Sequence, residues 1–68
     1  MENYFKDILK ELRLEKGIGQ ELLAKEIKVS KAVISMWENG LRVPTMFSLI
    51  AIADYFGVTI DYLVGREK

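Results

Sequence analysis

Five glycines and a single proline divide this chain of 68 residues into short segments. Apolar residues recur along these segments with the spacing of amphipathic helices. Sustained period-two alternation is missing, so strands are not expected. The predicted fold class is therefore all-α, a compact bundle of five short helices. The helices are expected over Asn3–Lys16, Gln20–Ile27, Lys31–Asn39, Met46–Phe56 and Ile60–Val64.

The predicted boundaries rest on residues that begin or end helices. Ser30, Thr45 and Thr59 each precede a helical segment, where a hydroxyl oxygen accepts a hydrogen bond from a first-turn backbone N–H. Four of the segments end at a glycine, which suits the close of a helix: Gly17, Gly40, Gly57 and Gly65.

Length and composition exclude several classes of protein. A chain of this length predicts one domain over residues 1–68, with no separate ligand-sensing domain. Cysteine and histidine are absent, which excludes disulfides and thiolate metal sites and removes the usual general base. No metal or cofactor is expected, and no nucleophile–base pair is visible, so an enzyme is not expected. Along the first predicted helix, the charges indicate a solvated, ion-paired face and not a catalytic pair: Asp7, Glu11 and Glu15 with Lys6, Lys10 and Arg13.

The charge balance argues against a polyanionic partner. Ten basic residues match ten acidic ones, whereas a DNA-binding domain is expected to be basic overall. Between Arg13 and Arg42 the balance is slightly positive, with six basic and four acidic residues. The apolar runs are too short to span a bilayer, and Met1–Leu9 lacks the pattern of a signal peptide. A cytoplasmic protein without a membrane partner is expected.

The most informative segment runs from about Gln20 to Asn39. Two short helices separated by a few residues must cross steeply, and Ala24 supplies the small side chain that such a contact needs. Val29 and Ile34 are expected to close a small core beneath this corner. The segment therefore predicts a helix-turn-helix.

The third predicted helix has two unlike faces. At 100° per residue, Val33, Ile34 and Trp37 fall on an apolar arc that is expected to face the core. The opposite arc is expected to face solvent and holds Lys31, Ala32, Ser35 and Met36. An exposed arc of small, flexible or cationic residues at a helix N-terminus suits the major groove of DNA. Trp37 also suits a stacking platform for single strands, but its position on the helix favours the core.

A wider set of residues carries a family resemblance: Leu12-Arg13, Lys16-Gly17, Gln20, Ala24, Val29-Ser30, Ile34-Ser35, Trp37-Glu38-Asn39-Gly40, Pro44, Leu49, Ala53 and Gly57-Val58 through Tyr62-Leu63. In this order and at these spacings, the chain resembles the Cro and phage-repressor type of helix-turn-helix, often called XRE-like. The resemblance implies a lambda-repressor-like domain of five helices that binds double-stranded operator DNA. It also implies a bacterial or phage transcriptional regulator, a repressor, and a homodimer on a palindromic site.

The resemblance also implies roles for individual residues. Lys31, Ala32 and Met36 match base-reading positions, and Ser35 lies near the same edge. Lysine suits guanine O6 or N7 or a phosphate, whereas alanine and methionine suit a thymine methyl. Three further residues match or lie near phosphate contacts: Gln20, Asn39 and Arg42. The alternatives are a solvated Lys31, a Met36 that is only a surface residue, and an Asn39 that only ends its helix.

Two positions depart from the family pattern near the predicted turn. Gly19 replaces the usual Thr or Ser cap, so the second helix is expected to begin less firmly. Lys28 stands where a turn glycine is common, and it is strained if the turn needs a left-handed residue.

The C-terminal part carries more apolar residues than one helix stripe buries. A dimer face is predicted at Met46, Phe47, Ile60, Tyr62 and Val64. Incomplete burial, which is common in small proteins, is the alternative. A further alternative for the whole chain is a protein-interaction module of the same fold, antitoxin-like or a co-regulator, with a protein partner and weak or no DNA binding.

Overall fold

The computed structural model describes residues 4–66, and this part of the chain contains helices and no strand. The helices are α1 (Tyr4–Lys16), α2 (Gln20–Ile27), α3 (Lys31–Glu38), α4 (Met46–Phe56) and α5 (Ile60–Leu63). The all-α prediction is confirmed. Helices α3 and α5 end one residue earlier than expected, because Asn39 and Val64 already have ψ near zero and serve as C-caps. Asn3, the predicted first residue of α1, lies outside the described residues.

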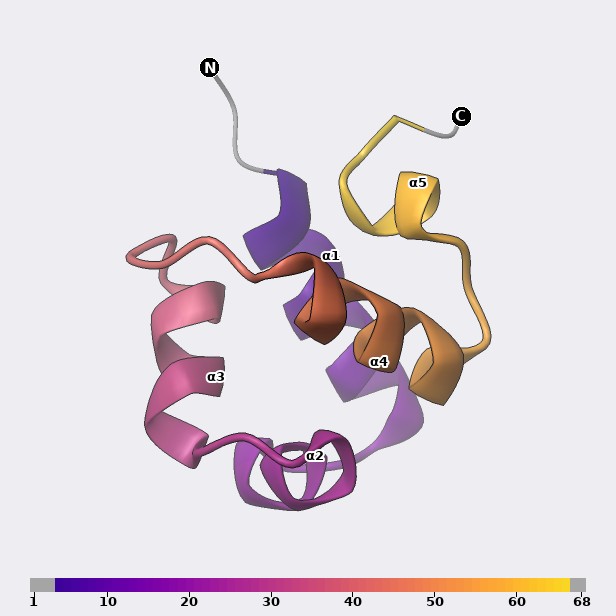
Figure 1. Ribbon diagram of the computed structural model, residues 1–68. Coiled ribbons are helices and arrows are strands. Elements are labelled where there is room, and N and C mark those ends of the chain that lie inside the picture. The colour runs from indigo at the N-terminus through magenta and orange to yellow at the C-terminus, as the bar shows by residue number, and fades with distance from the viewer. Residues whose placement is uncertain (1–3, 67–68) are drawn as a thin grey trace.

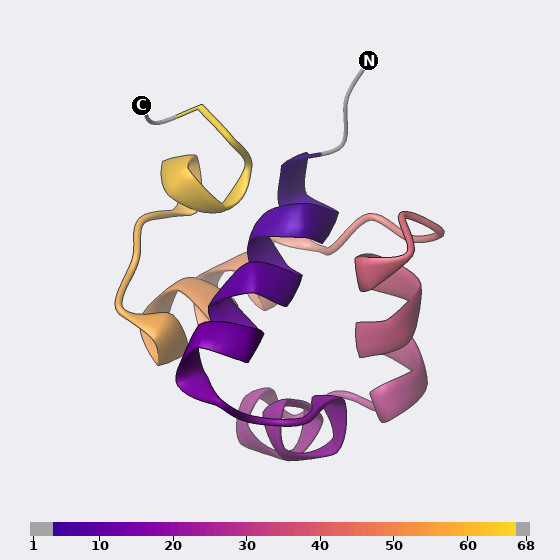
Figure 2. The ribbon, with the colours of Figure 1, turned by 180° about the vertical axis from the view of Figure 1, so that it is seen from behind.

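The helices surround one core (Figures 1 and 2). Helix α1 packs against α3 and α5, α2 packs against α3 and α4, and α4 packs against α5. In Figure 1 the corner between α2 and α3 lies at the lower left, while the start of α1 and helix α5 lie at the upper end. The α2–α3 corner is therefore at the end of the molecule away from both described chain ends.

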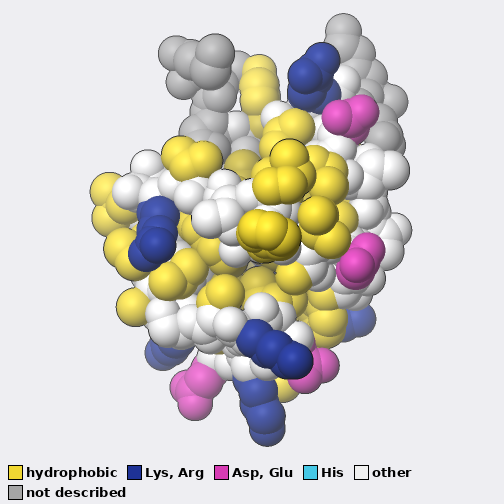
Figure 3. Space-filling view, in the orientation of Figure 1, with side chains coloured by type: hydrophobic (Ala, Val, Ile, Leu, Met, Phe, Trp, Pro, Cys, Tyr) yellow, Lys and Arg dark blue, Asp and Glu magenta, His cyan; other side chains and the backbone are white. Residues whose placement is uncertain are grey.

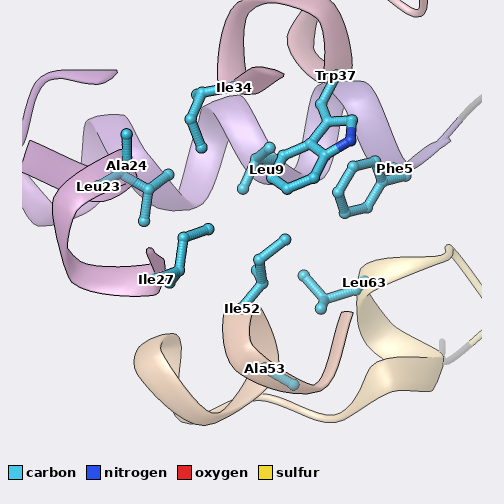
Figure 4. Close-up of a cluster of buried hydrophobic side chains, with 10 residues drawn as sticks. All are labelled: Phe5, Leu9, Leu23, Ala24, Ile27, Ile34, Trp37, Ile52, Ala53 and Leu63. Atoms are coloured by element: carbon cyan, nitrogen blue, oxygen red, sulfur yellow. The ribbon is translucent and has the colours of Figure 1, made fainter. Parts of the chain in front are cut away.

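Ten buried side chains form the core, and every helix contributes to it (Figure 4). They are Phe5, Leu9, Leu23, Ala24, Ile27, Ile34, Trp37, Ile52, Ala53 and Leu63. Leu63 is the buried residue of α5, and the partly buried Ile60 also packs this helix of four residues against the core. Burial of this apolar surface is the main term that favours folding.

Trp37 is a core residue, as its position on α3 predicted. Its ring packs edge-to-face against Phe5, with ring centroids 6.1 Å apart and an interplanar angle of 78°. The indole Nε1 lies toward Phe5 in Figure 4 and has no hydrogen-bond partner among the described residues. Trp37 thus stabilises the domain through apolar packing and is not a stacking platform on the surface.

The three predicted N-caps are confirmed. Ser30 Oγ accepts from the backbone N–H of Val33 at 3.2 Å. Thr45 Oγ1 accepts from the N–H of Ser48 at 3.1 Å, and Thr59 Oγ1 accepts from Tyr62 at 3.0 Å. Helix α2 differs, because its N-cap is Gly19, which makes no side-chain bond. Each hydroxyl cap contributes about 1 kcal/mol to the stability of its helix.

Lys28 ends α2 in the left-handed conformation, with φ 61° and ψ 47°. It is the one non-glycine residue with positive φ within residues 4–66. The other positive-φ residues there are Gly17, Gly40, Gly57 and Gly65. A left-handed residue with a Cβ atom is strained by about 1 kcal/mol, so the strain predicted at this turn is present.

Candidate nucleic-acid interface

A corner of three residues, numbered 28–30, joins α2 to α3. The backbone N–H of Val29 donates to the carbonyl of Ala24 at 2.9 Å, which turns the chain sharply at the end of α2. Ala24 and Ile34 are buried, and Val29 in the turn packs against the core cluster to which they belong. The small core that the sequence predicted here is confirmed.

Helix α3 has one face fixed in the core and one face turned outward. Ile34 and Trp37 are 0% and 2% exposed. On the opposite side Lys31 and Ala32 are exposed, and Ser35 and Met36 are half-buried. The edge formed by these four residues is called the α3 edge below. It is most open at the N-terminus of the helix, which is the end that reads base edges in helix-turn-helix proteins.

Lys31 is the first residue of α3 and is exposed. Within the described chain no carboxylate forms an ion pair with its ammonium group. The N-terminus of a helix disfavours a positive charge by some tenths of a kcal/mol. Lys31 therefore does not stabilise the fold, and its charge is available to an anionic partner.

Arg13 of α1 forms an ion pair with Glu38, the last residue of α3. Arg13 Nε donates to Glu38 Oε2 at 2.8 Å, and Nη2 donates to Oε1 at 3.0 Å. Arg13 Nη1 donates to the carbonyl of Ile18 at 2.9 Å. The two side chains are only 11% and 4% exposed. The hydrogen bond with Glu38 raises the pKa of Arg13, so the guanidinium is charged throughout the pH range in which proteins are studied.

This pair corrects one interpretation of the sequence. Arg13 is not part of the solvated face of α1, because its partner lies 25 residues away on α3 and not one turn away on the same helix. The pattern along α1 gave no sign of the pairing. The signal that could have found it is the presence of both Arg13 and Glu38 among the residues of the family resemblance.

Gln20 belongs to the same hydrogen-bond network. The sequence predicted a phosphate contact for this residue, and its Nε2 donates to Glu38 Oε1 at 3.1 Å. The network links α1 through Arg13, α2 through Gln20 and α3 through Glu38. It therefore helps to hold α3 in its orientation relative to α1 and α2.

Asn39 and Arg42 lie beyond the C-terminus of α3. Asn39 Nδ2 donates to the carbonyl of Ser35 at 2.8 Å and to Ser35 Oγ at 3.3 Å, so it caps the end of the helix. Arg42 is exposed in the loop before α4, and no ion pair holds it within residues 4–66. Both side chains are on the surface, at the end of α3 opposite to Lys31.

The helix-turn-helix family model HTH_3 matches residues 9–63, which is most of the chain and includes the corner and both of its helices. The chain belongs to this helix-turn-helix family. The resemblance seen in the sequence is thereby confirmed.

The curated relatives of the chain include both a transcriptional activator and a transcriptional repressor. The chain is 44% identical over 64 residues to the HTH-type transcriptional activator BcrR of Enterococcus faecalis, covering 94% of this chain and 31% of that protein. It is 30% identical over 64 residues to the cryptic phage CTXphi transcriptional repressor RstR of Vibrio cholerae, covering 94% of this chain and 58% of that protein. The chain thus spans between about a third and three fifths of the length of these relatives.

Solved structures of helix-turn-helix proteins share the whole fold. The P22 c2 repressor, in a complex with a synthetic operator, matches with a TM-score of 0.89 and 26% identity. The match covers 97% of this chain and 100% of that chain. A transcriptional regulator from Listeria innocua matches with a TM-score of 0.90 and 28% identity, covering 100% of this chain and 64% of that chain.

This helix-turn-helix domain also has an apolar surface outside the α2–α3 corner. Of the predicted dimer face, Met46, Phe47 and Tyr62 are exposed, whereas Ile60 and Val64 are half-buried. Two further exposed apolar residues lie in the loop before α4, and sequence reasoning missed them: Leu41 and Val43. Ile50 on α4 is exposed as well. Figure 3 shows hydrophobic side chains gathered over α4 on the face turned to the viewer.

The part of the domain that the structure describes has no pocket and no group of three or more side chains placed to hold a metal ion. No helix between residues 4 and 66 combines the length and the apolar character needed to cross a membrane. The described residues therefore offer two surface regions for contact with a partner, which are the α3 edge and the exposed apolar side chains over α4.

Proposed function

We propose that residues 1–68 act as one DNA-binding domain, with its helix-turn-helix at about residues 20–39, and regulate transcription in the cytoplasm. The observation that carries the proposal is the α3 edge, which presents Lys31 and Ala32 to solvent while Ile34 and Trp37 hold the helix from behind. Membership of the helix-turn-helix family and the likeness to an operator-bound repressor support it.

Base reading follows from the chemistry of the α3 edge. The Lys31 ammonium donates to guanine O6 or N7, and Ala32 and Met36 pack against thymine methyl groups. Ser35 Oγ already accepts from Asn39 Nδ2, so its hydroxyl hydrogen remains available to a base acceptor. The set of base-reading side chains is small and partly apolar, so the deformability of the DNA also contributes to the choice of site.

Phosphate contacts position the domain on the duplex. The Gln20 amide donates one of its two hydrogens to Glu38, and the second remains for a phosphate oxygen. Arg13 neutralises the charge of Glu38 close to this point. Asn39 and Arg42 approach the backbone at the other end of α3. A domain of net charge zero is expected to make a modest number of such contacts.

Lys31→Ala tests the assignment of the reading edge. Affinity for duplex DNA is measured by fluorescence anisotropy across a salt series, using sites selected from random duplexes. For the wild type, log K should fall with log salt by about 0.9 per phosphate contact. The variant should lose affinity or change its base preference, while its stability stays within about 0.5 kcal/mol, because Lys31 is exposed and unpaired.

The matched control is Lys10→Ala on the exposed surface of α1, which removes the same charge away from the corner. This control should bind as the wild type does. An affinity and base preference that Lys31→Ala leaves unaltered would show that the α3 edge does not read DNA.

We further propose that the domain forms a two-fold homodimer on palindromic DNA through Met46, Phe47, Ile60, Tyr62 and Val64. The support is the degree of exposure of the face, which reaches 86% at Phe47. Apolar area of this kind on a small domain marks an interaction surface when it is contiguous. A palindromic site with half-sites one turn of DNA apart requires the two α3 helices to lie about 34 Å apart.

Phe47→Asp is expected to weaken this dimer without unfolding the domain, because the side chain is outside the core. Sedimentation equilibrium should show the variant as a monomer at concentrations where the wild type is a dimer. Binding to a palindromic duplex should require more protein. The control is Leu14→Asp, which places the same charge at an exposed apolar position on α1. Equal association of the wild type and Phe47→Asp would exclude this face.

A protein-interaction module is the second candidate function. The apolar surface extends past the predicted dimer face to Leu41, Val43 and Ile50, and the net charge is zero. Both features favour a protein partner more than a polyanion. In the salt series above, this candidate predicts weak duplex binding with a flat response to salt.

A further inference from the structure

The ammonium group of Lys28 makes no hydrogen bond or ion pair in the described fold. The side chain of this residue is exposed. Its backbone meanwhile adopts the left-handed conformation that every other positive-φ position in this part of the chain assigns to glycine. Lysine is therefore an unfavourable residue for this backbone position, and its side chain gives the described fold no compensating contact.

The position of Lys28 places this charge beside the α3 edge. It lies two residues before Ser30, the N-cap of α3, and three residues before Lys31. Lys25 lies in the last turn of α2. The charged groups that share α2 with them are the exposed carboxylates Glu21 and Glu26. Figure 3 shows basic side chains at the lower end of the molecule, with acidic ones between them.

We propose that Lys28 is a phosphate-binding residue of the DNA interface. The proposal rests on the function proposed above. With the N-terminus of α3 in the major groove, the turn that immediately precedes it lies at the edge of the groove, where a sugar–phosphate backbone runs. A flexible lysine side chain at that turn places its ammonium on a phosphate. The strained backbone is thus retained for affinity and not for folding.

A purely structural explanation makes a different prediction. Lys28 caps the C-terminus of α2, where the helix dipole favours a positive charge. If that were its role, replacing Lys28 would lower the thermal midpoint and leave DNA binding unchanged. Lys25 already supplies a positive charge to the last turn of α2.

The experiment compares Lys28→Gly, Lys28→Arg and the wild type on random-sequence duplex DNA between about 50 and 200 mM salt. Lys28→Gly should reduce the slope of log K against log salt by about 0.9, the loss of one phosphate contact. Lys28→Arg keeps the charge and should keep the slope. The thermal midpoint of Lys28→Gly should be no lower than that of the wild type, because glycine relieves the strain. Lys10→Gln controls for the loss of a lysine on a remote surface.

The outcomes separate this proposal from the proposed function. A wild type that binds with a salt-dependent affinity, together with an unchanged slope for Lys28→Gly, overturns the role of Lys28 and leaves the function standing. A wild type whose binding is absent or indifferent to salt overturns both. A lower midpoint for Lys28→Gly with an unchanged slope assigns Lys28 to the helix terminus instead.

Discussion

Trp37→Ala will leave the domain barely folded at room temperature. The substitution removes the largest side chain of the core, which is 2% exposed and packs against Phe5. Truncating a buried tryptophan to alanine costs about 3–5 kcal/mol. A domain of this size has a total stability of roughly 3–10 kcal/mol. Urea unfolding followed by far-ultraviolet circular dichroism should show a midpoint shifted to very low urea, or no folded baseline.

Trp37→Phe distinguishes packing from polar interactions. The indole Nε1 has no hydrogen-bond partner among the described residues, so phenylalanine loses volume but no hydrogen bond. We expect a cost of about 2 kcal/mol and a domain that still unfolds cooperatively. Leu14→Ala, at an exposed position on α1, should stay within about 0.5 kcal/mol of the wild type. A Trp37→Ala variant as stable as this control would contradict the packing described for α3.

The substitution Glu38→Ala is expected to cause the second large loss of stability. It removes the acceptor of two hydrogen bonds from Arg13 and one from Gln20. The Arg13 guanidinium would be left with little access to water and without its counter-charge. The pair is partly buried, and leaving the charged donor of such a pair without its acceptor costs about 2–3 kcal/mol. Thermal unfolding should show a midpoint lowered by on the order of 15 °C.

A double variant tests whether this loss comes from the unpaired charge. Arg13→Met combined with Glu38→Met replaces the pair with apolar groups and should be more stable than Glu38→Ala alone. Glu26→Ala, an exposed carboxylate on α2, is the control and should change the midpoint little. If Glu38→Ala unfolds at the wild-type temperature, the network does not hold the corner together.

The local features of the fold were predictable because they depend on neighbours in the sequence. A hydroxyl at Ser30, Thr45 or Thr59 accepts from an N–H three residues away, so its capping role depends only on residues close in the sequence. The burial of Ile34 and Trp37 follows from helix geometry alone. The strain at Lys28 was predicted only through the family resemblance, in which glycine is common at this turn position.

The hydrogen-bond network of Arg13, Gln20 and Glu38 was not predictable by the same reasoning. Arg13 and Glu38 are 25 residues apart, and no periodicity links residues at that distance. Gln20 was correctly placed at the start of α2, whereas Asn39 lies one residue past the end of α3. Their amide groups already bond to Glu38 and Ser35. Which of these amides also contacts a phosphate depends on the path of the DNA, which the sequence of the protein does not contain. These roles stay predictions.

The shortness of α3 limits how much sequence one copy of the domain can read. Eight residues rise through about 12 Å, which corresponds to roughly three or four base pairs along a strand. A genome offers on the order of 10⁶–10⁹ competing sites, so a sequence of roughly three or four base pairs occurs far too often to specify one promoter. Specific binding at one genomic site by this fold therefore requires that two or more adjacent short sequences be recognised together.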